Sequence, residues 1–270
     1  MQTRVVAMEK NGKVYLVGAG PGDPELLTLK AVKAIAAADV LLVDDLVNTE
    51  VLVHASLRAR IVPVGKRGGC RSTSQAFIER LMIAEARAGK VVVRLKGGDP
   101  FIFGRGGEER AHLMAEGIEV DVINGISSGL AAPSSIGVPL THRDWSSGAI
   151  FVTGHERADD AGDARTPDWA LLGQTGLTLV IYMGVARCRQ IQAALLAGGK
   201  AGSTPVAVIQ SASGAGQAQL LTTLANLSED LAISGLGSPS IIVVGDVVRC
   251  ATVAGEDLSA LTAGFAASAS

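Results

Sequence analysis

A glycine-rich segment follows the first apolar run of the chain. It contains Gly18, Gly20, Pro21 and Gly22, and it leads from an expected strand into an expected helix. Glycine lets main-chain N–H groups approach a ligand without side-chain obstruction, and a helix N-terminus favours negatively charged groups. The spacing is neither that of a dinucleotide fingerprint nor that of a P-loop. A purely structural turn explains the same residues, so both interpretations stay open.

A second glycine-rich segment follows a later apolar run and adds charged side chains. Asp99 comes directly after Gly97 and Gly98. Its carboxylate can accept hydrogen bonds from ribose hydroxyls or an amino group, or it can serve a turn or a helix cap. Arg105 and Glu108 lie three residues apart at the start of an expected helix and share one face. An exposed ion pair of little energetic weight is the alternative for these two.

A string of small residues ends the first half of the chain, at 125–138, shortly before His142 and Arg143. Small side chains permit the close approach of a flat ligand. Simple helix packing around Ala131 and Ala132 explains the composition equally well. Both interpretations stay open for this string.

Short apolar runs must position these residues. In the first half they occupy 14–18, 40–45, 59–65, 91–99 and 118–125. Such runs alternating with helical patterns predict an α/β fold with buried strands, in which ligands sit at the carboxyl ends of strands. Apolar spacings of three and four residues predict two buried helical faces. These faces consist of Leu26, Leu29, Val32 and Ala36, and of Phe77, Leu81, Ala84 and Ala88.

A second series of apolar runs predicts a separate, smaller α/β domain. The runs occupy 149–155, 178–184, 206–211 and 240–248. The charged stretch 155–168 interrupts the series and is typical of a surface loop. We therefore expect an N-terminal α/β domain at 13–144, a C-terminal α/β domain at 145–250, and disordered tails at 1–12 and 259–270.

Composition excludes several classes of function. The chain has 270 residues, a formal net charge of −2 and 3% aromatic residues, which argues against nucleic-acid binding. Its three cysteines, Cys70, Cys188 and Cys250, lack any disulfide or zinc spacing, which favours the reducing cytoplasm. No apolar run approaches the length of a membrane span or a signal peptide, so we expect no membrane partner.

Several strings together resemble the tetrapyrrole methylase family. They are GAGPGDPELLTLKA, DDLV, VGKRGG, VVRLKGGDPFIFGRGGEE and GVPLTHR, and the resemblance spans about residues 14–250. It implies two α/β domains with the active site in the cleft between them, assembled as a homodimer. It also implies metal-independent methylation of uroporphyrinogen III at two ring carbons, with S-adenosylmethionine as methyl donor and precorrin-2 and S-adenosylhomocysteine as products.

The resemblance also assigns roles to individual residues. The positions that match the family's methyl-donor site are Pro21, Gly97, Gly98, Asp99, Ile102, Ser127, Ser128, Met183, Ala212 and Pro239. Asp44 and Lys66 match its acid and base candidates, and Arg105, Glu108 and Arg143 match positions that meet the macrocycle. For Asp44, capping of the next helix is the alternative. The chain departs from the family's usual pattern in reading NGISSGLAAP and SASGAG.

Other functions remain to be separated from this one. A later corrin-ring methyltransferase would share the donor site but accept a different macrocycle. More distant relatives methylate a translation factor or a ribosomal RNA, and the low aromatic content disfavours the RNA case. A non-catalytic nucleotide-binding module is a different class altogether. The pathway served, to sirohaem, cobalamin or haem d1, stays open.

Overall fold

The computed structural model describes residues 12–65, 74–155, 157–158 and 164–251. The chain divides into two compact units, residues 1–127 and 128–270. This division falls earlier than the expected boundary at residue 144, because the intervening segment packs on the second sheet. There Ala132, Ile136 and Val138 share a hydrophobic core with Val180. The expected tails lie outside the described residues except for Gly12.

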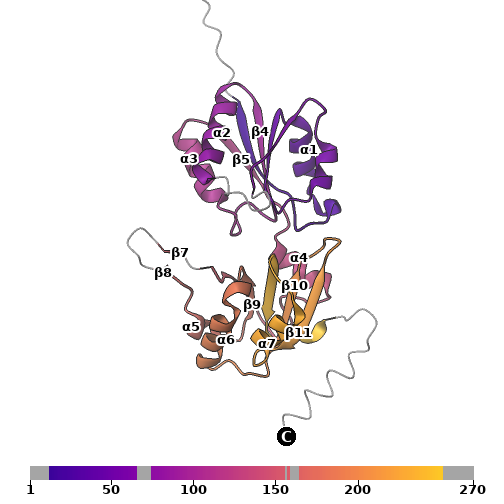
Figure 1. Ribbon diagram of the computed structural model, residues 1–270, viewed down its shortest axis with the longest axis vertical. Helices are drawn as coiled ribbons and strands as arrows, with labels where there is room; N and C mark the ends of the chain where they lie inside the picture. The colour runs from indigo at the N-terminus through magenta and orange to yellow at the C-terminus, as the bar shows by residue number, and fades with distance from the viewer. Residues whose placement is uncertain (1–11, 66–73, 156, 159–163, 252–270) are drawn as a thin grey trace, which may run out of the picture. The chain divides into compact units, whose positions relative to one another are not determined.

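The first unit is built on a parallel sheet with the strand order β3-β2-β4-β1-β5 (Figure 1). Its strands are β1 (Lys13–Gly18), β2 (Val40–Val43), β3 (Arg60–Pro63), β4 (Val91–Lys96) and β5 (Glu119–Ile123). Strands covered on both faces form continuous apolar runs, which is why the apolar runs in the sequence coincide with these strands. The prediction of an α/β fold is confirmed.

Helices cover both faces of this sheet. They are η1 (Pro24–Leu26), α1 (Leu29–Ala37), η2 (Thr49–His54), α2 (Gln75–Arg87) and α3 (Gly106–Ala115). Helix α1 lies on one face, and α2 and α3 lie on the other (Figure 1). Side-chain oxygens cap α1 and α2, since Thr28 accepts from the N–H of Ala31 and Ser74 from that of Phe77. Because the strands of this sheet all run parallel, they end at one edge, between the two helical layers.

The predicted buried faces of α1 and α2 are wrong. Leu29 is 81% exposed and Phe77 is 48% exposed. The side chains that α1 and α2 bury are instead Ala31, Ala34, Ile35, Ile78, Glu79, Met82, Ile83 and Ala86. Each helix carries apolar residues on two neighbouring stripes, and the spacing alone does not select between them.

The second unit has a mixed sheet with the order β11-β10-β12-β9-β6. Its strands are β6 (Ala149–Thr153), β9 (Thr178–Tyr182), β10 (Pro205–Gln210), β11 (Ala218–Thr223) and β12 (Ser240–Val244). Strand β12 runs antiparallel to both of its neighbours, β9 and β10. The ends of β9 and β10 therefore share an edge with the beginning of β12.

Helices of the second unit also lie on both faces. They are α4 (Ser128–Ser135), α5 (Trp169–Gly173), η3 (Val185–Arg187), α6 (Cys188–Ala197), α7 (Leu227–Ser234) and η4 (Asp246–Cys250). Helices α5, α6 and α7 pack on one face, and α4 packs on the other. Within the expected surface loop, β7 (Arg157–Ala158) and β8 (Ala164–Arg165) pair antiparallel.

Candidate functional site

Three loops meet at the carboxyl edge of the first sheet, where β1, β4 and β5 end. Gly20 and Gly98 exchange main-chain hydrogen bonds of 3.2 and 2.7 Å across the first two loops. Pro21 follows Gly20, and Gly97 precedes Gly98. The structure thus gathers Pro21, Gly97, Gly98 and Asp99 at one edge, where parallel sheets bind ligands.

Glycines, which have no side chain, let these loops pack main chain against main chain. A Cβ on Gly125 would lie 2.2 Å from the carbonyl oxygen of Gly98, and one on Gly18 would lie 2.5 Å from the nitrogen of Gly125. Gly98 also has a φ of +66°, which side chains disfavour. The edge is therefore lined by peptide groups, which suits a ligand recognised through main-chain hydrogen bonds.

The buried carboxylate of Asp99 joins two of these loops. Its Oδ1 accepts from the N–H of Phe101 at 2.8 Å, and its Oδ2 accepts from Asn124 Nδ2 at 3.0 Å and from the N–H of Gly125 at 3.2 Å. The turn-stabilising role is thus present in the structure. Because an ionised carboxylate has about four acceptor positions, a further donor can still bind it.

Ile102 and Ser127 are two further expected donor-site residues, and both flank this edge. Ile102, in the loop after β4, is 41% exposed. Ser127 is buried and ends the first unit, and Ser128 begins α4 in the second. The structure therefore divides the expected donor-site residues between the two units.

The second unit gathers the remaining expected donor-site residues at one edge of its sheet. Met183 follows β9, Ala212 follows β10, and Pro239 precedes β12. Met183 has a φ of +53°, in the left-handed region. Ser128 reaches the same edge, because the next N–H, that of Gly129, donates to Tyr182 Oη at 2.8 Å and Tyr182 is the last residue of β9.

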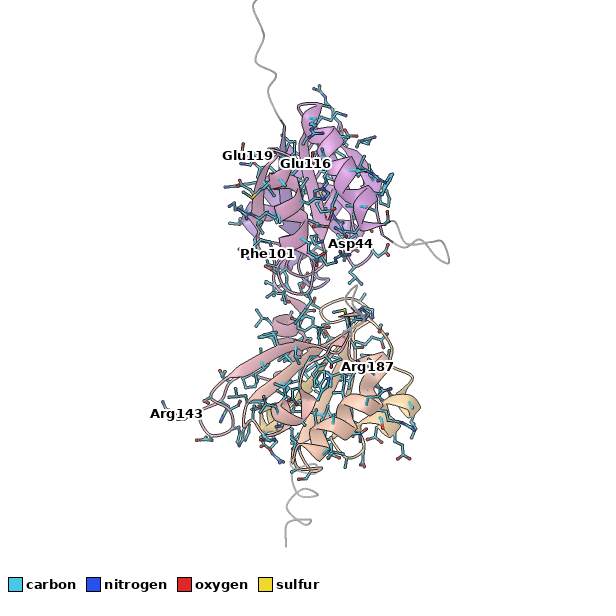
Figure 2. All side chains as sticks on the ribbon, turned by 90° about the vertical axis from the view of Figure 1, so that its left-hand side faces the viewer. Asp44, Phe101, Glu116, Glu119, Arg143 and Arg187 are labelled. Atoms are coloured by element: carbon cyan, nitrogen blue, oxygen red, sulfur yellow. The ribbon has the colours of Figure 1, made fainter. Side chains whose placement is uncertain are left out.

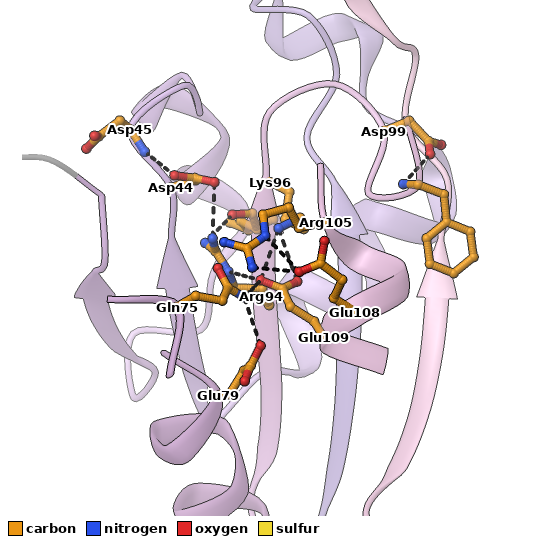
Figure 3. Close-up of polar contacts among 12 residues, drawn as sticks. Asp44, Asp45, Gln75, Glu79, Arg94, Lys96, Asp99, Arg105, Glu108 and Glu109 are labelled. Atoms are coloured by element: carbon orange, nitrogen blue, oxygen red, sulfur yellow. Dashed lines mark hydrogen bonds and ion pairs between the residues drawn. The ribbon is translucent and has the colours of Figure 1, made fainter. Parts of the chain in front are cut away.

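A group of charged side chains lies over the carboxyl end of β4, on the face covered by α2 and α3 (Figure 3). We name it the β4 charge cluster, and it consists of Asp44, Arg94, Lys96 and Glu109. Arg94 and Lys96 lie two residues apart on β4 and therefore face the same side of the sheet. Asp44 follows β2, and Glu109 comes from α3.

The cluster is held by close contacts between opposite charges. Lys96 Nζ lies 3.1 Å from each carboxylate oxygen of Glu109. Arg94 Nη2 donates to Asp44 Oδ2 at 3.1 Å, and Arg94 Nε lies 3.5 Å from Glu109 Oε1. Burial lowers the pKa of Lys96 most, the neighbouring Arg94 lowers it further, and Glu109 opposes both.

Beside the cluster, Arg105 and Glu108 form the expected ion pair at the start of α3. Arg105 Nη2 and Nε donate to Glu108 Oε2 at 2.6 and 3.0 Å. This hydrogen bonding raises the pKa of Arg105, as do the charges of Glu79 and Glu109. Both side chains of the pair are about half exposed, so the guanidinium is open to an anionic ligand.

Lys66 and Arg143 are the remaining expected site residues. Lys66 lies outside the described residues. Arg143 precedes β6, whereas Met183 follows β9, which runs parallel to β6. Arg143 therefore lies toward the opposite edge of the second sheet from Met183, and Figure 2 shows its side chain at one side of this unit.

Sequence reasoning missed Arg94, Lys96 and Glu109. A signal was present in the run VVVRLK, because two cations at alternate positions of a buried strand must share one face and need a counter-charge. The second glutamate of GGEE supplies that charge.

The described part of the chain contains no group of three or more His, Cys, Asp or Glu side chains placed to hold a metal ion. In the same described ranges, no helix has the length and apolar character required to cross a membrane.

Comparison with known proteins shows which family the chain matches. The family described as Tetrapyrrole (Corrin/Porphyrin) Methylases matches residues 13–228. The uroporphyrinogen-III C-methyltransferase of Pseudomonas aeruginosa is 54% identical over 239 residues, which cover 88% of this chain and 95% of that protein. The enzyme of the same name from Bacillus subtilis is 48% identical over 239 residues, covering 88% of this chain and 91% of the relative.

A solved structure shows the same fold. The uroporphyrin-III C-methyl transferase of Thermus thermophilus, complexed with S-adenyl homocysteine, aligns with a TM-score of 0.74 at 40% identity. The alignment covers 88% of this chain and 94% of that one. The chain belongs to the tetrapyrrole (corrin/porphyrin) methylases.

Proposed function

We propose that the protein transfers methyl groups from S-adenosylmethionine to two ring carbons of uroporphyrinogen III, giving precorrin-2 and S-adenosylhomocysteine. The observation that carries this proposal is the similarity to enzymes named uroporphyrinogen-III C-methyltransferase, which reaches 54% identity over 88% of the chain. The structure contributes the glycine-lined edge of the first sheet, where main-chain groups can bind a ligand closely.

The proposal assigns methyl-donor binding to the residues that match the family's donor site. They are Pro21, Gly97, Gly98, Asp99, Ile102, Ser127, Ser128, Met183, Ala212 and Pro239. Support comes from their gathering at one edge of each sheet, and from the related structure that holds S-adenyl homocysteine. The main-chain lining at Gly97 and Gly98 fits a ligand recognised through its polar groups.

The reaction forms a bond between a pyrrole carbon and the methyl carbon and breaks the carbon–sulfur bond. When bound, S-adenosylmethionine supplies an electrophilic methyl group. The chain must align the macrocycle with this group, and alignment of reactants can contribute roughly 7–11 kcal/mol. The ring system is left cationic and must lose a proton, which we assign to the carboxylate of Asp44. Asp44 is 34% exposed and so can reach a bound macrocycle.

Cations are needed because uroporphyrinogen carries eight carboxylates, whose transfer from water into a site is costly without counter-charges. Arg105, which pairs with Glu108, lies beside the β4 charge cluster. Lys66 and Arg143 are the other cations of the proposed set. The place of Arg143 away from Met183 makes it the contact in most need of a test. We expect Arg143→Ala to raise KM for the macrocycle without changing donor affinity, and unchanged kinetics would remove it from the site.

We further propose that the enzyme is a homodimer working in the cytoplasm. The family resemblance supports the first, and light scattering during size-exclusion chromatography tests it. Support for the second is the cysteine pattern, with Cys188 and Cys250 as free thiols in the described part of the chain.

The test of the function is incubation of the protein with S-adenosylmethionine and uroporphyrinogen III, followed by mass measurement of the product. We expect a gain of two methyl groups. A later corrin-ring methyltransferase would leave uroporphyrinogen III unchanged while still binding S-adenosylhomocysteine in calorimetry. A nucleotide-binding module would show no preference for S-adenosylhomocysteine over ATP or NAD.

A further inference from the structure

The carboxylate of Glu109 lies at the centre of the β4 charge cluster and is wholly buried. It contacts Lys96 through both oxygens, accepts a hydrogen bond from Gln75 Nε2 at 2.9 Å, and faces Arg94 Nε at 3.5 Å. One side chain therefore ties α2, α3 and β4 together.

Arg94 continues the chain of contacts to Asp44, the proposed proton acceptor. Its Nη1 donates to the carbonyl of Leu95 at 3.1 Å, and its Nη2 donates to Asp44 Oδ2. The other oxygen of Asp44 accepts from the N–H of Asp45 at 2.9 Å. Two donors thus fix the rotation of the Asp44 carboxylate, and one of them belongs to a guanidinium whose Nε faces Glu109 Oε1 in a 3.5 Å ion pair.

Stability alone is a poor reason for such an arrangement. Buried ion pairs are often no more stabilising than apolar residues of similar volume, because the charges lose their hydration. The Nε of Arg94, which is 3% exposed, has no hydrogen-bond partner in the described part of the chain. A buried guanidinium left short of one partner, but aimed at a functional carboxylate, is better explained by placement than by stability.

We propose that Glu109 is a positioning residue, which orients the Arg94 guanidinium and through it the Asp44 carboxylate for proton removal. This inference rests on the proposed methyl transfer. Glu109 does not touch the macrocycle, so its contribution belongs to the rate of the bound complex and not to substrate or donor affinity.

The first variant is Glu109→Gln, which keeps the shape of the side chain and removes its charge. We expect kcat to fall by about tenfold or more, with KM for uroporphyrinogen III and the Kd for S-adenosylhomocysteine within about twofold of wild type. The matched control is Glu116→Gln at the opposite end of α3, where Glu116 pairs with Arg87 (Figure 2). The control is expected to keep wild-type kcat.

A double-mutant cycle separates positioning from general weakening of the structure. If Glu109 acts through Asp44, then adding Glu109→Gln to Asp44→Asn costs less than twofold further in kcat, because the group being oriented is already gone. Losses that multiply in the double variant overturn the proposal. Wild-type kcat in Glu109→Gln also overturns it, as does a loss confined to KM or to donor affinity.

Glu109→Asp decides the matter if Glu109→Gln does not fold. It keeps the negative charge and withdraws it by one methylene, so we expect a lowered kcat with intact S-adenosylhomocysteine binding, and wild-type kcat would overturn the proposal. Failure of the proposed function is a different result, because wild-type protein would then form no methylated product at all.

Discussion

The carboxyl edge of the first sheet and the edge of the second sheet where β9 and β10 end carry different kinds of residue. The first carries charged side chains over β4, together with a main-chain floor of glycines. The second carries Met183, Ala212 and Pro239, none of them charged. Positive φ angles occur in the first unit at Phe103 and Arg105, and also in the second unit. Met183, Ser211 and Ser213 all have positive φ angles there.

This difference indicates that the two edges have different roles, one in proton transfer and one in shaping the surface. Proton removal needs an ionisable group held in place, and among the described residues the first edge supplies Asp44 next to a network of opposite charges. A left-handed residue such as Met183 instead aims peptide groups in a direction that ordinary strands and turns do not offer. We infer that the first unit carries the reactive groups and that the second contributes surface shape.

The strongest challenge to this division is Asp44→Asn. The change removes the proposed proton acceptor while keeping its size, so we expect kcat to fall by about 100-fold or more with S-adenosylhomocysteine affinity unchanged. Initial rates of S-adenosylhomocysteine formation measure it. Asp246→Asn in the second unit, which removes an exposed pair with Arg249, serves as the control. Near-normal kcat in Asp44→Asn would contradict the assignment of chemistry to the first unit.

Gly125→Ala tests the main-chain floor of the first edge. The added methyl would overlap the carbonyl of Gly98, so we expect the free energy of unfolding to fall by about 1–3 kcal/mol, with weaker S-adenosylhomocysteine binding. Denaturant unfolding and calorimetry measure the two effects. Gly176→Ala, where no atom lies within 4 Å of the added carbon, is the matched control. Equal behaviour of both variants would show that close packing of these loops is unimportant.

Met183→Gly tests whether the second edge works through its backbone. Glycine adopts the left-handed conformation freely, so we expect stability to rise by about 1 kcal/mol with only a small loss of S-adenosylhomocysteine affinity. Met183→Val, with a branched side chain in the same conformation, should be destabilised. Thermal unfolding and calorimetry of both variants provide the measurement. Abolished binding in Met183→Gly would assign the contact to the side chain and weaken the contrast between the edges.

The smallest effect concerns charges at the opposite edge of the first sheet. Glu85 pairs with Arg60 and with Lys90, whose hydrogen bond is the main cause of the lowered pKa of Glu85. A carboxyl whose pKa is lowered from 4.5 by folding stabilises the protein above that pH, and the effect is lost as pH falls through the folded-state pKa. We expect Glu85→Gln to cost about 0.5–1 kcal/mol at pH 7, with kcat unchanged.

Unfolding of Glu85→Gln and wild type at neutral and strongly acidic pH checks this sign. The difference between them should shrink as the wild-type carboxyl becomes protonated. A difference that persists unchanged at acidic pH would mean that the ion pairs are not its source. A change in kcat would mean that charge at either edge serves the reaction.

Strand positions were predictable because a buried parallel strand leaves an unbroken apolar run. The run at 14–18 became β1 at Lys13–Gly18, and the glycine-rich loops fell at the carboxyl edge as expected. Helix faces were not predictable in the same way. In α2 both the stripe of Phe77 and that of Ile78 are apolar, and only the packing of the sheet selects the second.

The candidate site was predictable where residues are adjacent in the chain and hidden where the fold brings them together. Arg105 and Glu108 pair within one helical turn, as their spacing indicates. Glu109 meets Lys96 only because α3 packs back over β4 after the glycine-rich loop. The compact units divide at residue 127, before residue 144, for a related reason, since the small residues of α4 fit the second sheet through contacts distant in sequence.

The carboxylate of Asp99 has a consequence for motion. Its Oδ1 accepts from the N–H of Phe101 and its Oδ2 from the N–H of Gly125, so any motion that withdraws the carboxylate frees both amides. Hydrogen exchange through that motion should expose the two amides together. Asp99→Ala, which removes both acceptor oxygens, would free the two loops together, so their exchange rates should rise in the same variant.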